Sequence, residues 1–367
     1  MHKNCLTYPV EFVKNVFGES SDALAKMLLN GREGAPAPRV LLVADQNVVQ
    51  RTEGLGMKIG RYVHTHGIEL AGSPVVVGGG ERAKMDDMQS AVRVATAMLG
   101  ARLGRSDFVL AIGGGALLDV AGWAAAQVMG GIPVIRMPTT PEAMLDAAFA
   151  DYSALNSASV KDAFRVWSMP AGVIVDTSFA QTVLDGVWRG GIGEAVRLSL
   201  ARDSALLKRI TAMATPYHGR DQAALDDIVS AAFASRNKKG GTTLALWSAL
   251  RLQAMSGWKL PHGYAVSIGV LIDLAYAVIA GNVTESARDK IIDLFSECGT
   301  LDGLVHSQYL LQQQDALLSG LDDWRRTSPG GSVEVLAGVG KVKTTAEPDI
   351  GHFREALKYL VSLPVRH

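Results

Sequence analysis

Five short apolar runs in the first half of the chain restrict its fold more than any other feature. They span Arg39–Asp45, Ser73–Glu81, Asp107–Gly115, Ile132–Thr140 and Ala171–Thr177, and in each the apolar residues are followed by Gly, Asp or Thr. Such continuous runs are typical of strands buried on both faces of a parallel sheet. Helical patterns lie between them, at 86–104 and 116–130. The first half therefore predicts an α/β domain built on a parallel sheet.

The second half has a different pattern. From about Phe179 onward strand-like runs nearly disappear, and helical periodicity dominates windows such as 190–214 and 262–281. A length of 367 residues fits about two domains. We expect a boundary near 178–185, which gives an α/β domain over 1–180 and an all-α domain over 181–367.

Composition excludes several classes of protein. The 36 basic and 36 acidic residues cancel, which argues against a nucleic-acid partner. The chain has two cysteines, Cys5 and Cys298, and no apolar core of a signal peptide near its start, so we expect a cytoplasmic protein. The apolar run 264–281 contains Asp273 and is expected to be a buried helix rather than a membrane span.

Three loops after predicted strands indicate a nucleotide site. In Gly113–Gly115 the glycines let the backbone approach a phosphate at a helix N-terminus, although tight strand–helix packing would also explain them. Asp45 ends the first strand, where its carboxylate could accept ribose hydroxyls. Glu81 and Lys84 could flank a ribose and a pyrophosphate, or lie on a solvated loop. Ligands of α/β sheets bind beyond the carboxyl ends of the strands, where all three loops are expected.

Four segments resemble the sugar phosphate cyclases, the family of 3-dehydroquinate synthase and 2-epi-5-epi-valiolone synthase. Residues 112–148 resemble the central segment of that family and 77–84 its NAD loop. Residues 190–203 resemble its first metal-ligand motif, and 262–270 its last. The N-terminal segment 8–17 and the surroundings of Trp247 resemble the valiolone-synthase-like branch of Ebo-type clusters.

The resemblance implies a dehydroquinate synthase-like fold, with an N-terminal Rossmann-like domain and a C-terminal helical domain. It also implies a homodimer and a small-molecule sugar phosphate as substrate. It implies that NAD oxidises a substrate hydroxyl, phosphate is eliminated, the hydride returns and an aldol step closes a carbocycle. A Zn²⁺ or Co²⁺ ion would polarise the hydroxyl. By resemblance, the cofactor-binding residues are Asp45, Glu81, Lys84, Gly114, Gly115, Asp119, Thr139 and Thr140. The metal ligands are Glu194 and His262, and the catalytic residues are Asp146, Lys161, Arg197 and Arg251.

Several positions depart from the family pattern. The middle histidine ligand of the family falls at Leu246, which cannot bind a metal and leaves fewer than three protein ligands. A family lysine falls at Tyr152, and another is replaced by Arg197, which changes hydrogen-bond geometry. Without the third ligand, Glu194 could instead pair within its helix and His262 could be a satisfied, buried histidine. Each lost cation or ligand could cost ~3 kcal/mol of transition-state stabilisation.

Three hypotheses remain open from the sequence. The chain is a working cyclase with a rearranged pocket, or a non-catalytic family member that binds NAD or a sugar phosphate as a partner or regulator. The third is an NAD-linked dehydrogenase of the glycerol-dehydrogenase type, which needs more histidine ligands than this chain offers.

Overall fold

The predicted strands form one parallel sheet in the computed structural model, which describes residues 6–29, 38–157 and 160–363. The chain divides into two compact units, with the division between Val183 and Leu184; the predicted boundary followed residue 180.

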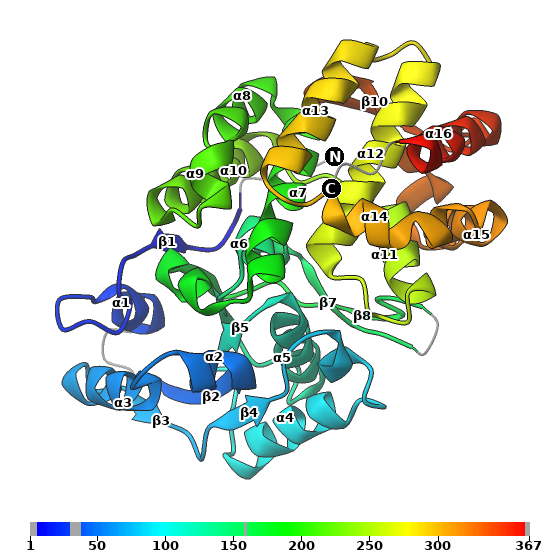
Figure 1. Ribbon diagram of the computed structural model, residues 1–367. Coiled ribbons are helices and arrows are strands. Elements are labelled where there is room, and N and C mark those ends of the chain that lie inside the picture. The colour runs from blue at the N-terminus through cyan, green and yellow to red at the C-terminus, as the bar shows by residue number, and fades with distance from the viewer. Residues whose placement is uncertain (1–5, 30–37, 158–159, 364–367) are drawn as a thin grey trace. The chain divides into compact units, whose positions relative to one another are not determined.

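The first unit contains a seven-stranded sheet in the order β1-β9-β6-β5-β2-β3, with β4 also paired to β2 (Figure 1). Its pairs are all parallel. The strands are β1 (Val10–Phe12), β2 (Arg39–Asp45), β3 (Glu69–Leu70), β4 (Val75–Val77), β5 (Phe108–Gly113), β6 (Val134–Pro138) and β9 (Gly172–Val175). A separate antiparallel hairpin consists of β7 (Tyr152–Leu155) and β8 (Phe164–Trp167). The sequence analysis did not predict β1, β3 or this hairpin.

The helices of the first unit connect these strands. They are α1 (Ala23–Leu29), α2 (Gln46–Arg51), α3 (Leu55–Thr65), η1 (Glu81–Lys84), α4 (Gln89–Gly100), α5 (Gly115–Gln127), α6 (Pro141–Leu145), η2 (Ala147–Phe149) and η3 (Thr177–Thr182).

Helices bury both faces of the sheet, as the apolar runs predict. Alternate residues of β2, β5 and β6 form one core cluster with side chains of α1 and α3. The residues between them, such as Val43 and Ala111, are equally buried and lie on the opposite face. The α/β prediction is therefore confirmed.

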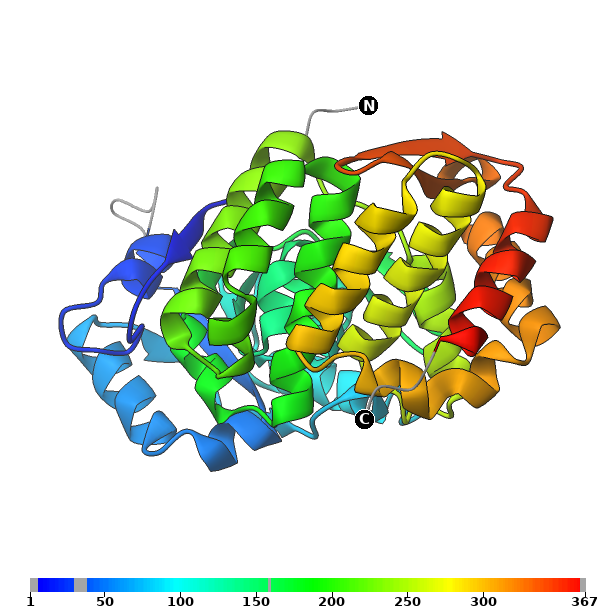
Figure 2. The same cartoon turned by 45° about the horizontal axis from the view of Figure 1, so that its top comes forward.

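The second unit is largely helical. Its helices are α7 (Asp185–Arg202), α8 (Ser204–Ala212), α9 (Ala214–His218), α10 (Gln222–Lys239), α11 (Leu246–Met255), α12 (His262–Ile279), α13 (Glu285–Glu297), α14 (Asp302–Leu311), α15 (Gln314–Thr327), η4 (Pro329–Gly331) and α16 (Ile350–Ser362). It also holds an antiparallel hairpin, β10 (Val333–Gly338) and β11 (Lys341–Thr345), which the prediction of an all-α domain missed. Figure 2 shows this hairpin in orange-red along one end of the helices of this unit.

The apolar run 264–281 lies in α12. This helix is long and apolar enough to cross a membrane, but 78% of it is buried inside the structure. That burial is typical of a core helix, which agrees with the prediction from Asp273.

Candidate active site

The carboxyl ends of four neighbouring strands meet at one edge of the sheet in the first unit. Asp45 of β2 pairs with Val77 of β4, Ala44 pairs with Ile112 of β5, and Gly113 pairs with Pro138 of β6. From β2 the chain runs to β3 and β4 on one side and then returns to β5 on the other. This reversal places a topological switch point between β2 and β5, where open α/β sheets bind ligands.

Asp45 lies directly beside that point. Its carboxylate is buried and caps α2, because Oδ1 accepts a hydrogen bond of 2.7 Å from the Asn47 backbone N–H. A Cβ added at Gly113 would lie 3.0 Å from the Cβ of Asp45, and one at Gly79 would lie 3.0 Å from its Oδ1. Glycine at these two positions lets the neighbouring loops approach the carboxylate closely.

The glycine turn after β5 leads into the N-terminus of α5. A Cβ at Gly114 would lie 3.1 Å from the Thr140 side chain, and one at Gly115 would lie 3.1 Å from Ala147. Gly114 and Gly115 therefore also allow close packing, which is the alternative explanation that the sequence left open. The first amides of α5 have no partner inside the helix and still form a site for an anion.

Two threonines follow β6 at the same edge. The Thr140 hydroxyl caps α6 by accepting from the Ala143 N–H at 3.2 Å. Thr139 is fully buried, and its hydroxyl has no hydrogen-bond partner within the described residues. A buried polar atom of this kind needs an explanation, and a bound ligand would provide one.

A buried ion network lies next to these loops. The Lys84 ammonium contacts Asp119 of α5 and Asp162 of the β7–β8 turn, each at 2.6 Å, and only 2% of its side chain is exposed. Burial alone would lower the pKa of Lys84, but the surrounding carboxylates, Asp119 first, raise it well above its ordinary value. Burial raises the pKa of Asp119, whereas Lys84 and Lys161 outweigh burial and lower that of Asp162.

Glu81 extends this network. Its two oxygens accept from the Lys161 ammonium at 2.5 Å and from the Asn156 amide at 2.8 Å. Burial would raise the pKa of Glu81, but Lys161 and Lys84 lower it below its usual range. The sequence analysis named Lys84, Lys161 and Glu81 but missed Asn156 and Asp162. Both predicted lysines are thus already paired with carboxylates.

The predicted catalytic Asp146 lies at the end of α6, half-buried, before η2. Nearby, Arg136 of β6 is buried and donates to the carbonyls of Ala150 and Ser168, at 2.7 and 2.6 Å. Arg136 thereby holds the segment that follows Asp146. A charged residue inside a strand expected to be buried on both faces was the signal for it, and the sequence analysis passed over it.

Tyr152, at the position of a family lysine, is half-buried at the start of β7. The Arg165 guanidinium lies 5.2 Å from its ring centre. Burial, with the nearby Asp162 carboxylate, raises the pKa of the Tyr152 phenol, so the side chain is neutral.

The second unit brings together both predicted metal ligands. Glu194 of α7 accepts from Arg197, three residues later, with Oε2 at 2.8 Å from Nε and 2.6 Å from Nη2. Its other oxygen, Oε1, lies 3.0 Å from Nε2 of His262 at the start of α12. The His262 Nδ1 lies 3.0 Å from Oε1 of Gln253 on α11. Burial would raise the pKa of Glu194, but Arg197 and then His262 lower it to about 2.

Glycine contacts set the distance between α7 and α12 at this site. A Cβ at Gly263 would lie 2.2 Å from the Gly190 carbonyl oxygen, and one at Gly193 would lie 2.7 Å from the Gly263 carbonyl oxygen. Only backbones without side chains fit together here. The Gly that follows His262 therefore has a packing role.

Replacing Gly263 with alanine should lower the free energy of unfolding by about 1–3 kcal/mol, because the added methyl overpacks a backbone contact. Chemical denaturation measures this. Gly281→Ala is unsuitable as a control, because Gly281 has a positive φ of 71° and an alanine there would add backbone strain. Gly60→Ala is the control, because a Cβ at Gly60 meets nothing within 4 Å. Equal stability of the Gly263 and Gly60 variants would contradict the close contact.

The remaining predicted residues of this unit lie on α11. Leu246 begins this helix and is partly buried. Arg251 donates from Nε to the Ala316 carbonyl of α15 at 2.8 Å, so it packs against that helix. The described residues contain no group of three or more His, Cys, Asp or Glu side chains that could hold a metal ion. The donors present therefore do not fit a catalytic zinc site with three protein ligands.

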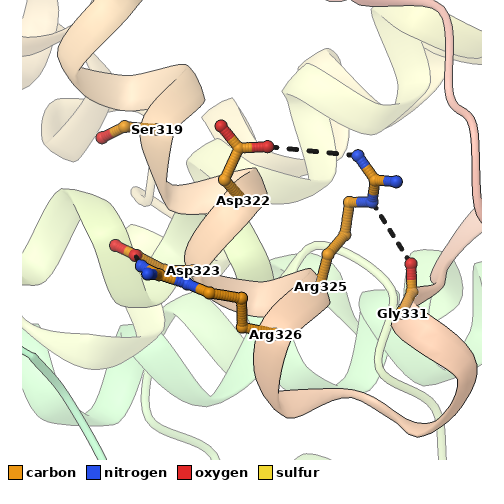
Figure 3. Close-up of a pocket in the computed structure, with 6 residues that line it drawn as sticks. All are labelled: Ser319, Asp322, Asp323, Arg325, Arg326 and Gly331. Carbon is orange, nitrogen blue, oxygen red and sulfur yellow. Dashed lines mark hydrogen bonds and ion pairs between the residues drawn. The ribbon is translucent and has the colours of Figure 1, made fainter.

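One surface pocket of about 590 Å³ in the second unit contains none of the predicted residues. Figure 3 shows its lining side chains, and its two arginines pair with neighbouring aspartates, Arg325 with Asp322 and Arg326 with Asp323. With its cations neutralised in this way, the pocket is no strong candidate for an anionic substrate.

Comparisons with known proteins agree with this geometry. The model of the 3-dehydroquinate synthase N-terminal domain matches residues 74–189, which include the glycine turn and the Lys84 network. The 3-dehydroquinate synthase of Sulfurisphaera tokodaii is 27% identical over 230 residues, 59% of this chain and 65% of that enzyme. The enzyme of Pyrobaculum islandicum is 28% identical over 295 residues, 74% of this chain and 84% of its own length. Over these residues the chain is similar to the sugar phosphate cyclases.

The fold of the chain is also that of a solved sugar phosphate cyclase. The structure of 2-epi-5-epi-valiolone synthase from Streptomyces hygroscopicus, with NAD⁺ and Zn²⁺ bound, matches with a TM-score of 0.81. Identity is 20%, and the match covers 98% of both chains. At this identity the likeness shows the fold alone.

Proposed function

We propose that the chain is a 3-dehydroquinate synthase-like sugar phosphate cyclase with an altered second site. It would act on a sugar phosphate such as sedoheptulose 7-phosphate, eliminating phosphate and closing a carbocycle with the help of NAD. The observation that carries the proposal is the family match over 74–189, because it covers the loops after β4, β5 and β6 at the switch-point edge of the sheet. The placement in the valiolone-synthase-like branch stays a prediction.

The residues at the sheet edge fit NAD. The cofactor would supply a reversible hydride acceptor. Asp45 has a second carboxylate oxygen, beside its capping oxygen, for ribose hydroxyls. The amides after Gly114 would bind the pyrophosphate, and the buried Thr139 hydroxyl would gain a partner. Lys84 would hold the loop after β4 against α5 through Asp119, rather than contact a phosphate as a free cation.

Asp146 and Lys161 remain the candidates for substrate contacts in the first unit. Lys161 is buried and paired with Glu81, so any substrate phosphate would compete with that carboxylate. We place Arg197 in a supporting role, because its guanidinium is fully buried against Glu194. We include the predicted homodimer and a reducing, cytoplasmic location in the proposal; Cys298, a buried free thiol, fits the latter.

A non-catalytic family member is the second candidate. The pairing of Glu194 with Arg197 and His262 favours it, because both predicted metal ligands already satisfy each other. Such a protein would bind NAD or a sugar phosphate without turnover.

Release of inorganic phosphate separates the two candidates. Purified protein would be given NAD with sedoheptulose 7-phosphate, or with the heptulosonate phosphate substrate of 3-dehydroquinate synthase. We expect release with one sugar and its loss in Asp146→Ala, because Asp146 is a candidate for contact with the substrate. No release with either sugar, from protein that still binds NADH, would support the non-catalytic candidate.

Asp45→Ser is the matched variant for cofactor binding. Serine keeps a good helix cap for α2 but removes the carboxylate, so folding should be preserved. We expect NADH affinity, measured by fluorescence titration, to fall about 10- to 100-fold, because hydrogen bonds to a charged group are lost. Unchanged affinity would show that NAD does not bind at Asp45.

A further inference from the structure

We propose that the second unit binds no catalytic divalent ion, and that the Arg197 guanidinium takes the place of that ion as the fixed positive charge beside Glu194. The inference concerns ion binding and holds whether or not the chain turns over a sugar phosphate. Three features of the described residues support it: the carboxylate, the imidazole and the missing third ligand.

Both oxygens of the Glu194 carboxylate are occupied. Oε2 accepts a hydrogen bond from Nε of Arg197 and forms an ion pair with its Nη2 at 2.6 Å, and Oε1 faces the His262 ring. Glu194 and Arg197 side chains are each 1% exposed, so water does not compete for the pair. A guanidinium keeps its proton at any ordinary pH, so it remains a cation next to the carboxylate. A divalent cation at the same oxygens would be repelled by the Arg197 guanidinium and would have to displace it.

Both nitrogens of His262 are also occupied. Nε2 lies 3.0 Å from Glu194, and Nδ1 lies 3.0 Å from the Gln253 amide oxygen. The Gln253 amide nitrogen in turn lies within 3.4 Å of the Leu260 carbonyl, which fixes the orientation of the amide. A metal-bound histidine offers one nitrogen lone pair to the ion and uses the other nitrogen to orient the ring. Here protein oxygens face both nitrogens.

The third ligand position is apolar. Gln253 lies about two helical turns beyond Leu246, so both share one face of α11, the face that reaches His262. The segment before Leu246 is held by Arg197 itself, which donates from Nη1 to the Thr242 carbonyl. Arg197 thus joins α7 to the start of α11, and Leu246 offers no donor there.

Arginine and lysine differ in what they would allow at this position. A lysine carries a compact, hydrated charge on a flexible stem and can move away from a carboxylate. The planar fork of Arg197 binds Glu194 and Thr242 together and is held in place by both. Restoring an ion site should therefore require two changes. One is a histidine donor at position 246, and the other is a lysine at position 197, whose ammonium can move away from Glu194.

The first measurement is the metal content of the wild-type chain. Protein incubated with excess Zn²⁺ or Co²⁺ and then desalted should retain less than about 0.1 ion per chain, and neither Zn²⁺ nor EDTA should move its thermal midpoint. About one ion per chain, lost in Glu194→Ala, would overturn the proposal.

The second measurement restores the site. The double variant Leu246→His with Arg197→Lys should bind Co²⁺ or Zn²⁺ at least about 100-fold more tightly than wild type, by calorimetry and by Co²⁺ absorption. The control pairs Arg197→Lys with Met255→His, which places the histidine on the opposite face of α11 and should gain nothing. A folded double variant without gain, checked by circular dichroism, would contradict the proposal. If it does not fold, the wild-type metal content decides alone, and neither readout requires substrate.

Discussion

Replacing Lys84 with methionine should lower the free energy of unfolding by about 3–5 kcal/mol at pH 7, because it leaves buried carboxylates without their cation. Lys84 contacts Asp119 and Asp162 at 2.6 Å each, and Glu81 lies close enough to raise its pKa. Methionine keeps the length of the side chain, so packing is largely preserved. Urea denaturation of the two proteins at equal pH measures the difference.

Arg209→Met provides the matched comparison. Arg209 also pairs with a carboxylate, Asp227, but its side chain is 56% exposed. Exposed pairs contribute about 0–1 kcal/mol, so this variant should lose much less stability. The deficit of Lys84→Met should shrink as the pH falls, because protonation removes the unpaired charges. Similar losses of stability in both variants would contradict a stabilising role of the buried ion pairs of Lys84.

Replacing Asp273 with asparagine should make the stability of the protein less sensitive to a rise in pH from about 4 to about 7. Asp273 of α12 is fully buried, and burial raises its pKa from 3.8 to about 7, although hydrogen bonds from Ala245 and Trp247 lower it in part. Between about pH 4 and pH 7 the folded chain therefore holds a proton that the unfolded chain has lost. Stability must fall as the pH rises through this window and level off above it.

The Asp273→Asn variant lacks this titration but keeps an acceptor for the Ala245 N–H, which donates at 2.8 Å. Its stability relative to wild type should rise by about 2–3 kcal/mol between pH 5 and pH 8. Asp322→Asn, at a side chain that is 76% exposed, should show no such trend. Parallel pH profiles for wild type and Asp273→Asn would contradict a raised pKa in the folded chain.

The sequence predicted those elements whose pattern is local. Continuous apolar runs predicted β2, β5, β6 and β9, because a strand that is buried on both faces needs apolar side chains at successive positions. The hairpin β10–β11 was missed although Val-Glu-Val and Lys-Val-Lys alternate around a Gly-rich turn. A helical context on both sides masked this period of two.

The candidate site was predictable only as far as single positions allow. Leu246 is recognisable from the sequence because a single substitution removes the nitrogen donor of a histidine. The pairing of Glu194 with Arg197 follows from their spacing within one helix. The contact of Lys84 with Asp162 does not, because it joins residues that only the folded chain brings together. A charged residue in a sequence shows its sign but not its partner.

The glycine contact between α7 and α12 has a consequence for how such a site can change. Gly190, Gly193 and Gly263 let the two backbones touch, so main-chain contact fixes the distance between Glu194 and His262. The backbone geometry of the site is then independent of whether the two side chains bind a metal ion or pair with other side chains. Substitution of side chains at this site can therefore exchange a metal ion for an internal ion pair while the packing of α7 against α12 is kept. Substitution can also reverse that exchange.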